Sequence, residues 1–314
     1  MSNYWQRRNE ELKHIQLQFQ TDADYNRELR RIYDSGQREI QKEVDSFLQN
    51  YAGRENLSMD EAIKKVDKMD VEAFRDKAKR YVEEKDFSPR ANDELRAFNV
   101  KMRMNRHQLL NEHIRLETVA MANSEERLLT ARLDEEVYKE MQRQAGILGM
   151  TVPSPERIRA FSKVIVAADF KGTNFSNRIW ANQSELQAEL ENVMRRTIIR
   201  GENPRVAARQ LKGLVNDGVG SAKYKAERIA ITESGRIQIS TQIESFKEFG
   251  IEQLEVIVEP DGCSICQEHD GEIVNVADAV QGDNVPIFHP NCRCSTSSYV
   301  DRDAWDADLR SRGL

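Results

Sequence analysis

The sequence Cys263-Ser-Ile-Cys266 is followed, after 22 residues, by His289-Pro-Asn-Cys292-Arg-Cys294. These two short stretches contain all four cysteines of the 314-residue chain. A Cys-x2-Cys pair followed by His-x2-Cys has the ligand spacing of a structural zinc site, because each tight turn aims two side chains at one tetrahedral ion. The spacing predicts one structural zinc ion bound by Cys263, Cys266, His289 and Cys292, with Cys294 as the alternative to Cys292.

Other interpretations of the cysteine cluster stay open. The thiols could be reduced without a metal, or Cys263 and Cys294 could form a disulfide in an exported particle that meets oxidising surroundings. A catalytic zinc would need an open coordination position and a general base, for which Glu268 and Asp270 lie near in sequence. A nuclease centre would need His289 as its general base, and the simpler role for this residue is that of a structural metal ligand. His269 is expected on an exposed turn. The closed set of thiol and imidazole ligands favours a structural ion.

The composition favours long, solvated helices over a thick globular core. Charged residues make up 32% of the chain and hydrophobic residues 39%. No apolar run approaches the ~18 residues of a membrane span, and the first residues lack the apolar core of a signal peptide. We therefore expect a protein made in a reducing cytoplasm, with no membrane contact. Residues 251–314 contain 13 Asp and Glu against four Arg. This acidity weighs against a zinc finger that neutralises DNA phosphates.

The spacing of apolar residues predicts long helices in the first half of the chain, over residues 1–50 and 90–146. Ser58 is expected to cap a further helix between them. The near-heptad apolar positions of the second long helix fit a surface helix packed on its neighbours or a coiled coil. His107 and His113 are expected on solvated faces of this helix.

Residues 149–155 contain glycine and two prolines and predict a domain boundary. The predicted fold is mainly α, with an elongated helical region, bundle-like or coiled-coil-like, at residues 1–150. A small α+β domain with a zinc-stapled β-hairpin is predicted at residues 151–314. Its expected elements are a helix or strand at 158–168, a helix from a Ser184 cap to Arg200, helices from Pro204 and from Ala222 to Phe249, and strands at 253–258, 272–275 and 295–300.

The longest helix of this second region contains the stretch Ala226-Glu-Arg228-Ile-Ala-Ile-Thr232-Glu233. An Arg and a Glu on a helix are usually solvated or form a surface ion pair of little energetic value. Because Ile229, Ala230 and Ile231 lie between them, one of Arg228 and Glu233 is expected to be partly buried and paired.

This helix, the Asp-Gly-Cys-x-x-Cys turn and the closing Pro286-x-x-His-Pro-Asn-Cys-Arg-Cys together resemble the Mu F-like minor head proteins of tailed bacteriophages, also called phage head morphogenesis proteins. The family typically has Arg-Thr-Glu on the helix and two prolines before the final His-Pro. Here Ile231 replaces the Arg, and Val285 stands where the first proline often lies. The resemblance covers about residues 202–299. It implies that the second region, residues 151–314, is a Mu F-like domain.

The resemblance implies a structural protein of the virion and not an enzyme. It implies a low-copy minor head (minor capsid) protein at the portal vertex or in the capsid interior, with roles in head assembly, DNA packaging or DNA ejection. The implied partner is the phage portal protein, and the major capsid protein, a scaffold and packaged DNA are further candidates. A DNA-binding protein inside the virion is the alternative function, and a metal-dependent nuclease is a third.

Overall fold

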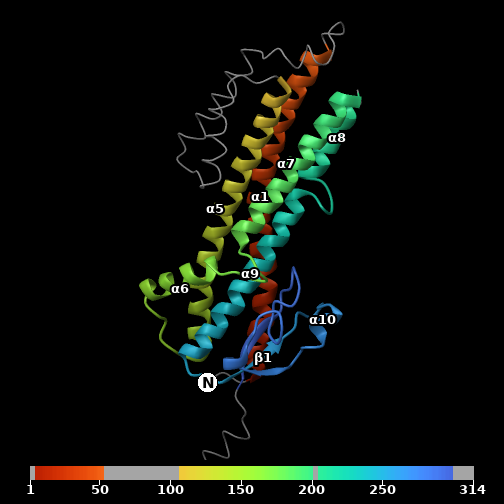
Figure 1. Cartoon of the computed structure of the whole chain (residues 1–314). Helices are drawn as coiled ribbons and strands as arrows, with labels where there is room; N and C mark the ends of the chain where they lie inside the picture. Colours follow the sequence, from red (N-terminus) through yellow and green to blue (C-terminus); the bar gives the residue numbers. More distant parts are fainter. Residues whose placement is uncertain (1–3, 53–105, 201–203, 300–314) are drawn as a thin grey trace, which may run out of the picture. The chain divides into compact units, whose positions relative to one another are not determined.

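The computed structural model describes residues 4–52, 106–200 and 204–299 (Figure 1). Within these ranges the chain is mainly helical, with a small antiparallel sheet near its C-terminal end. The helix predicted after Ser58 and the first part of the helix predicted at 90–146 lie outside the described residues.

Two long helices, α1 (Tyr4–Ala52) and α5 (Arg106–Leu148), confirm the helical prediction for the described part of the first half. Their buried apolar residues recur at three- and four-residue intervals, as a helix needs when one face packs against neighbours. In the second half of α5 they include Leu129, Leu133, Val137, Met141 and Ala145, each four residues after the last. The expectation for His113 is wrong: it lies one turn after Leu109 on the buried face and is only 2% exposed.

Four helices follow, and one of the predicted starts is wrong. Ser184 does not cap a helix, because its hydroxyl donates to the Trp180 carbonyl at 2.8 Å inside a helix that begins at Phe175. Residues 158–167 are helical, and Ser154 caps that helix by accepting from the Arg157 backbone N–H. The starts at Pro204 and after Ser221 are confirmed. The helices are α6 (Pro155–Ala167), α7 (Phe175–Arg200), α8 (Pro204–Val215) and α9 (Ala222–Glu248).

The three predicted strands are confirmed as one antiparallel sheet in the order β2-β1-β3. They are β1 (Gln253–Ile257), β2 (Ile273–Asn275) and β3 (Ser295–Tyr299). Short helical turns, α10 (Ser264–Gln267) and η1 (Val276–Asp278), lie between the strands in sequence. The central strand packs Leu254 and Val256 into a core that also contains Ile239 and Phe246 of α9. The sheet and α9 therefore share one apolar core.

The folded chain forms two compact units, each assembled from separate segments. The first, here called the cysteine unit, comprises Met1–Tyr25, Leu129–Phe175 and Arg228–Leu314. The second, here called the helical unit, comprises Asn26–Leu128 and Ser176–Glu227. The division predicted between residues 150 and 151 follows the order of the sequence, and it stays a prediction.

The cysteine unit contains a buried cluster of charged and polar side chains. Arg143 of α5 donates to both carboxylate oxygens of Glu11 in α1, at 2.8 and 2.9 Å, and to Glu140 at 2.7 Å. Ser295 of β3 donates to the same Glu11 carboxylate, at 2.8 Å. Burial would raise the pKa of Glu140, but Arg143 outweighs it and lowers this pKa to about 2. At Glu11 burial prevails over Arg143, and the pKa is raised.

The helical unit contains a buried carboxyl group of its own, Glu125 of α5. It accepts hydrogen bonds from the Tyr33 hydroxyl at 2.7 Å and from the Gln183 amide at 3.3 Å. Burial raises the pKa of Glu125 to about 7, and these two hydrogen bonds offset only part of that effect. The protonation state of this carboxyl group therefore changes near neutral pH.

Candidate metal centre

Two short turns place the cysteines and His289 close together. After β1, the Gly262 backbone N–H donates to the Glu259 carbonyl at 2.8 Å and turns the chain into α10. Cys263 is the N-cap residue of α10, and Cys266 lies within its single turn. On the other side, the Cys292 backbone N–H donates to the His289 carbonyl at 3.2 Å.

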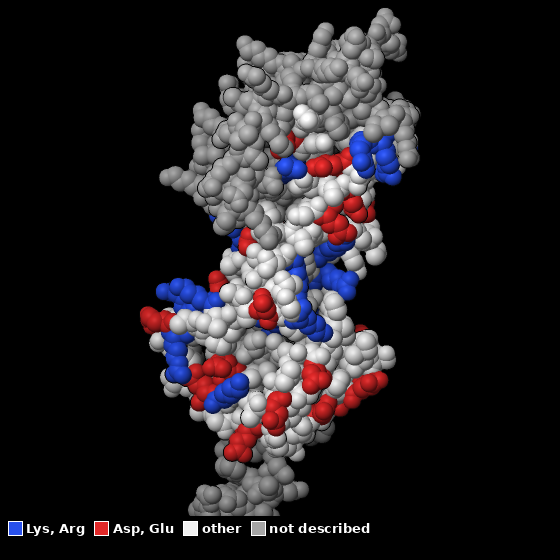
Figure 2. Space-filling model, viewed as in Figure 1, with Lys and Arg blue, Asp and Glu red and all other residues white. Residues whose placement is uncertain are grey.

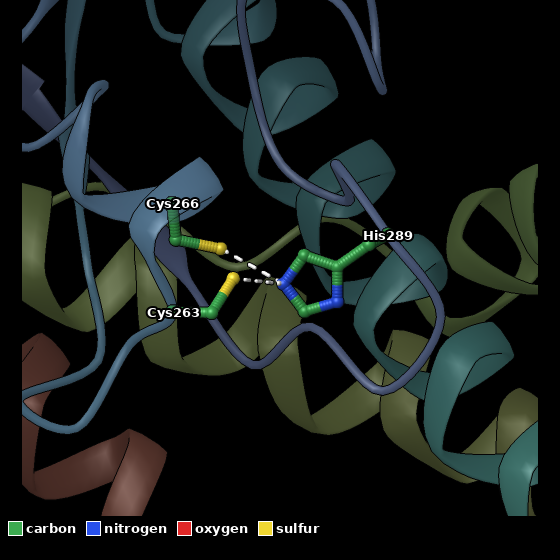
Figure 3. Close-up of side chains that lie close together, drawn as sticks. All are labelled: Cys263, Cys266 and His289. Atoms are coloured by element: carbon green, nitrogen blue, oxygen red, sulfur yellow. Dashed lines mark hydrogen bonds between the residues drawn. The ribbon is translucent and has the colours of Figure 1, made fainter.

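The side chains form two groups in which every ligand atom lies within 4.8 Å of the others in its group. One group is Cys263, Cys266 and His289, and the other is Cys266, Cys292 and Cys294. Figure 3 shows both sulfurs of the first group pointing toward His289 Nε2, at 3.2 Å from Cys263 and 3.0 Å from Cys266. The structure thus brings together all five residues that the sequence singles out.

The separations suit a small tetrahedral ion. Zinc with Zn–S bonds of about 2.3 Å and a Zn–N bond of about 2.0 Å holds its ligand atoms roughly 3.5 to 3.8 Å apart. The sulfurs of Cys266 and Cys292 are 3.8 Å apart. The two sulfur–nitrogen distances, 3.2 and 3.0 Å, are a few tenths of an ångström shorter than this range. The cluster can therefore bind a metal ion.

The hydrogen bonding of His289 presents the correct nitrogen to the cysteines. Nδ1 lies 2.8 Å from the Pro290 carbonyl oxygen, which can only accept a hydrogen bond. The proton of the neutral imidazole is therefore on Nδ1, and the lone pair of Nε2 faces the sulfurs. This is the arrangement in which a histidine binds a metal while its second nitrogen is held by a carbonyl group.

The two C-terminal cysteines have different electrostatic roles. A hydrogen bond from the Cys294 thiol lowers the pKa of Cys292 to about 5, and the same bond raises the pKa of Cys294. Burial, followed by the nearby charge of Cys292, raises the pKa of Cys266 to about 12. Backbone hydrogen bonds lower the pKa of the exposed Cys263.

The residues considered for a catalytic centre have other contacts. Asp270 accepts from the Arg8 guanidinium and from the Val258 backbone N–H, each at 3.0 Å. The ring of His269 stacks on Phe288 with 4.1 Å between ring centroids, and its Nδ1 lies 2.7 Å from the Glu272 carboxylate. Its side chain is 26% exposed, so it is less exposed than expected for a turn. These contacts tie loops to one another and place neither residue in the two groups.

The predicted pairing of Arg228 or Glu233 takes a different form in the structure. Glu233 is fully buried, and its partner is Arg236, whose Nε donates to it at 2.6 Å. Arg236 also donates to the Ile165 carbonyl at 2.9 Å, at the end of α6. Sequence reasoning missed Arg236, although its three-residue spacing from Glu233 on a helix was a usable signal.

The surface around the cluster is acidic. Among the described residues from 251 onward, Arg293 is the one Lys or Arg, and it is half-buried beside Asp22. On the face shown in Figure 2, acidic side chains predominate over the sheet and α10. The exposed acidic residues include Asp261, Glu268, Asp270, Glu272, Asp278 and Asp283. A surface of this charge repels the phosphates of nucleic acids.

Fold and site together define a mainly helical protein with a small antiparallel sheet and a Cys/His cluster able to bind a metal ion. Residues 188–297 match the family described as phage Mu protein F like protein. The match covers about a third of the chain and includes the whole cluster, and it confirms the resemblance for this segment. This segment of the chain is thus similar to the Mu F-like family.

Searches among curated proteins and among solved structures found no match. Among the helices of the described ranges, none combines the length and the apolar character needed to cross a bilayer.

Proposed function

We propose that this chain is a structural minor head protein of a tailed bacteriophage, positioned in the capsid interior or at the portal vertex. The observation that carries the proposal is the family match at residues 188–297, which contains both the Cys/His cluster and the helix that supports it. In this proposal the protein binds the phage portal protein and acts in head assembly, DNA packaging or DNA ejection. Contacts with the major capsid protein, a scaffold or packaged DNA belong to the same proposal.

A co-purification experiment tests this function. In it the affinity-tagged chain is co-expressed with the portal protein and the major capsid protein of its phage. The portal protein is expected to co-purify with it, and mass spectrometry of purified heads is expected to find the chain at few copies per head. Absence of the chain from purified heads would contradict a virion role. If the chain is present in purified heads but does not bind the portal protein, its partner must be another head component.

We further propose that one structural zinc ion occupies the cluster, with Cys263, Cys266, His289 and Cys292 as ligands. The 3.8 Å separation of the Cys266 and Cys292 sulfurs supports this set. Four such ligands fill the tetrahedral positions of zinc, which favours a structural role over a catalytic one. Zinc would join the end of β1 to the loop before β3 and would contribute folding energy to a small sheet.

The acidic surface around the cluster supports protein contacts over DNA binding for this part of the chain. If the alternative role in binding packaged DNA holds, DNA affinity will fall steeply with rising salt, because binding then releases counterions from phosphates. The absence of DNA binding at low salt would remove that alternative.

A further inference from the structure

We infer that Thr232 of α9 is a positioning residue for the metal centre, because its hydroxyl holds the turn between His289 and Cys292 in place. This inference rests on the proposed zinc site and extends it to a residue that is not a ligand. Thr232 lies in the stretch Ala226–Glu233 that the family resemblance singles out. No role for its hydroxyl follows from the sequence.

The Thr232 hydroxyl connects the helix to the turn with a defined polarity. Its Oγ1 donates to the Arg228 carbonyl one turn earlier in α9, at 2.7 Å. The backbone N–H of Asn291 donates to the same oxygen, at 3.1 Å. Because a hydroxyl has a single proton, the bond to Arg228 leaves only lone pairs facing the turn. Thr232 therefore acts as a fixed acceptor for the turn.

The residue that Thr232 holds has a left-handed backbone conformation. Asn291 has φ 66°, a conformation that asparagine adopts more readily than most residues other than glycine. It lies between His289 and Cys292, so its conformation decides how these two side chains face each other. A hydrogen bond from its N–H to a buried helix fixes that conformation before a metal binds. Hydrogen bonds around a metal centre orient the side chains that bind the ion.

Gly235, one turn further along α9, forms the second part of this support. A Cβ at this position would lie 3.1 Å from the Cys292 carbonyl oxygen and 2.6 Å from Ile287 Cδ1. The absence of a side chain therefore lets the backbone of Cys292 rest directly against the helix. Thr232 and Gly235 are three residues apart and share one helical face. We call these two residues the loop seat.

The same helix also holds the beginning of the loop that leads to His289. The Gln281 amide donates to the Arg236 carbonyl at 2.8 Å, and the Ser240 hydroxyl donates to the Gln281 side-chain oxygen at 3.2 Å. Both ends of the loop are thus attached to α9. Consequently, α9 sets the position of His289 and Cys292, whereas Cys263 and Cys266 are positioned by β1 and α10.

Zinc affinity of the full-length chain, measured by competition with a chromophoric chelator, tests the loop seat. Thr232→Val keeps the shape and removes the acceptor, and we expect about tenfold weaker zinc binding. Thr232→Ser restores the hydroxyl and is expected to bind zinc nearly as well as the wild type. Thr241→Val is the matched control, because Thr241 is also buried in α9 and its hydroxyl donates within the helix, to the Ile237 carbonyl at 2.8 Å.

Two further measurements keep the test decisive if Thr232→Val folds poorly. Gly235→Ala pushes on the Cys292 carbonyl and is expected to weaken zinc binding, whereas Gly146→Ala in α5, with no atom within 4 Å of the added Cβ, is not. Cobalt substitution reports geometry, and both seat variants are expected to change the cobalt–thiolate absorption bands. Helical circular dichroism separates these effects from unfolding.

These outcomes separate a failure of the loop seat from a failure of the zinc proposal on which it rests. Weaker binding in Thr232→Val and Gly235→Ala, with unchanged binding in Thr241→Val and Gly146→Ala, supports the loop seat. Wild-type affinity in both seat variants overturns the loop seat and leaves the zinc site standing. A well-folded wild-type chain that binds no zinc overturns both.

Discussion

The carboxylate of Glu11, near the start of α1, accepts a hydrogen bond at 2.8 Å from the Ser295 hydroxyl, at the start of β3. The two residues are 284 positions apart in sequence. Arg143 of α5 and Gln242 of α9 reach the same carboxylate, so α1, α5, α9 and the sheet are joined through one buried group. The segment that matches the phage family is therefore completed by helices outside the match.

Removing the cation of this cluster is expected to destabilise the cysteine unit. Arg143→Met leaves the buried carboxylates of Glu11 and Glu140 without their cation, and the free energy of unfolding should fall by about 3–5 kcal/mol. Urea unfolding followed by circular dichroism measures this loss. Lys139→Met, which removes an exposed ion pair with Glu135, is the control and should change the stability by less than about 1 kcal/mol. Equal effects of the two substitutions would contradict a structural role for the cluster.

The buried carboxyl group of Glu125 is expected to make the stability depend on pH. Its folded-state pKa of about 7 lies above the usual 4.5, so its contribution is fully present below about pH 4.5 and is lost as the pH rises through 7. The difference amounts to roughly 3 kcal/mol at most.

Glu125→Gln is expected to abolish this part of the pH dependence, because the amide cannot ionise. The free energy of unfolding, measured by denaturant titration from pH 4.5 to 8.5, provides the test. Glu135→Gln, at a largely exposed position of the same helix, should keep the wild-type slope. If the Glu125→Gln variant retains the full slope, another group is responsible.

Zinc binding is expected to depend on Cys292 more than on Cys294. Native mass spectrometry should find about one zinc per wild-type chain, no zinc in Cys263→Ser or Cys292→Ser, and retained zinc in Cys294→Ser with lower affinity. The expectation follows from the proposed ligand set, in which Cys292 is a ligand and Cys294 is not. Loss of zinc in Cys294→Ser but not in Cys292→Ser would exchange the two roles. Chelation should also lower the melting temperature of the wild type.

Close packing of α1 and α5 in the helical unit depends on a glycine. A Cβ at Gly36 would lie 2.2 Å from Met121 Sδ, so Gly36→Ala should lower the free energy of unfolding by about 1–3 kcal/mol. Gly213→Ala in α8, where no atom lies within 4 Å of the added Cβ, should instead be neutral or stabilising.

Shortening Met121 tests the cause of that destabilisation. Met121→Ala alone is expected to cost about 2–5 kcal/mol because it leaves a cavity, yet the double variant Gly36→Ala/Met121→Ala should lose less than the sum of the two. Strict additivity would show that the two positions do not compete for the same space.

The sequence by itself determined the elements whose causes are local. Apolar spacing predicted α1 and α5, capping and proline signals located the starts of α8 and α9, and alternation predicted β1, whereas the start of α6 at Pro155 was not predicted. The ligand spacing singled out the five residues of the cluster. Ser184 shows the limit of such signals, because a serine can cap a helix or bond back to a carbonyl inside one, and its neighbours in sequence do not decide between these states.

Only the tertiary structure decided which polar groups are buried together. His113 is buried because its helical face meets other helices, and Glu233 pairs with Arg236 where α9 meets the end of α6. The contact between Glu11 and Ser295 and the loop seat at Thr232 and Gly235 join segments that are far apart in sequence. A local pattern reports the period of a helix or strand, whereas the partner of a buried polar group depends on how distant segments pack. For that reason the sequence predicts the metal ligands, and the folded chain identifies what holds them.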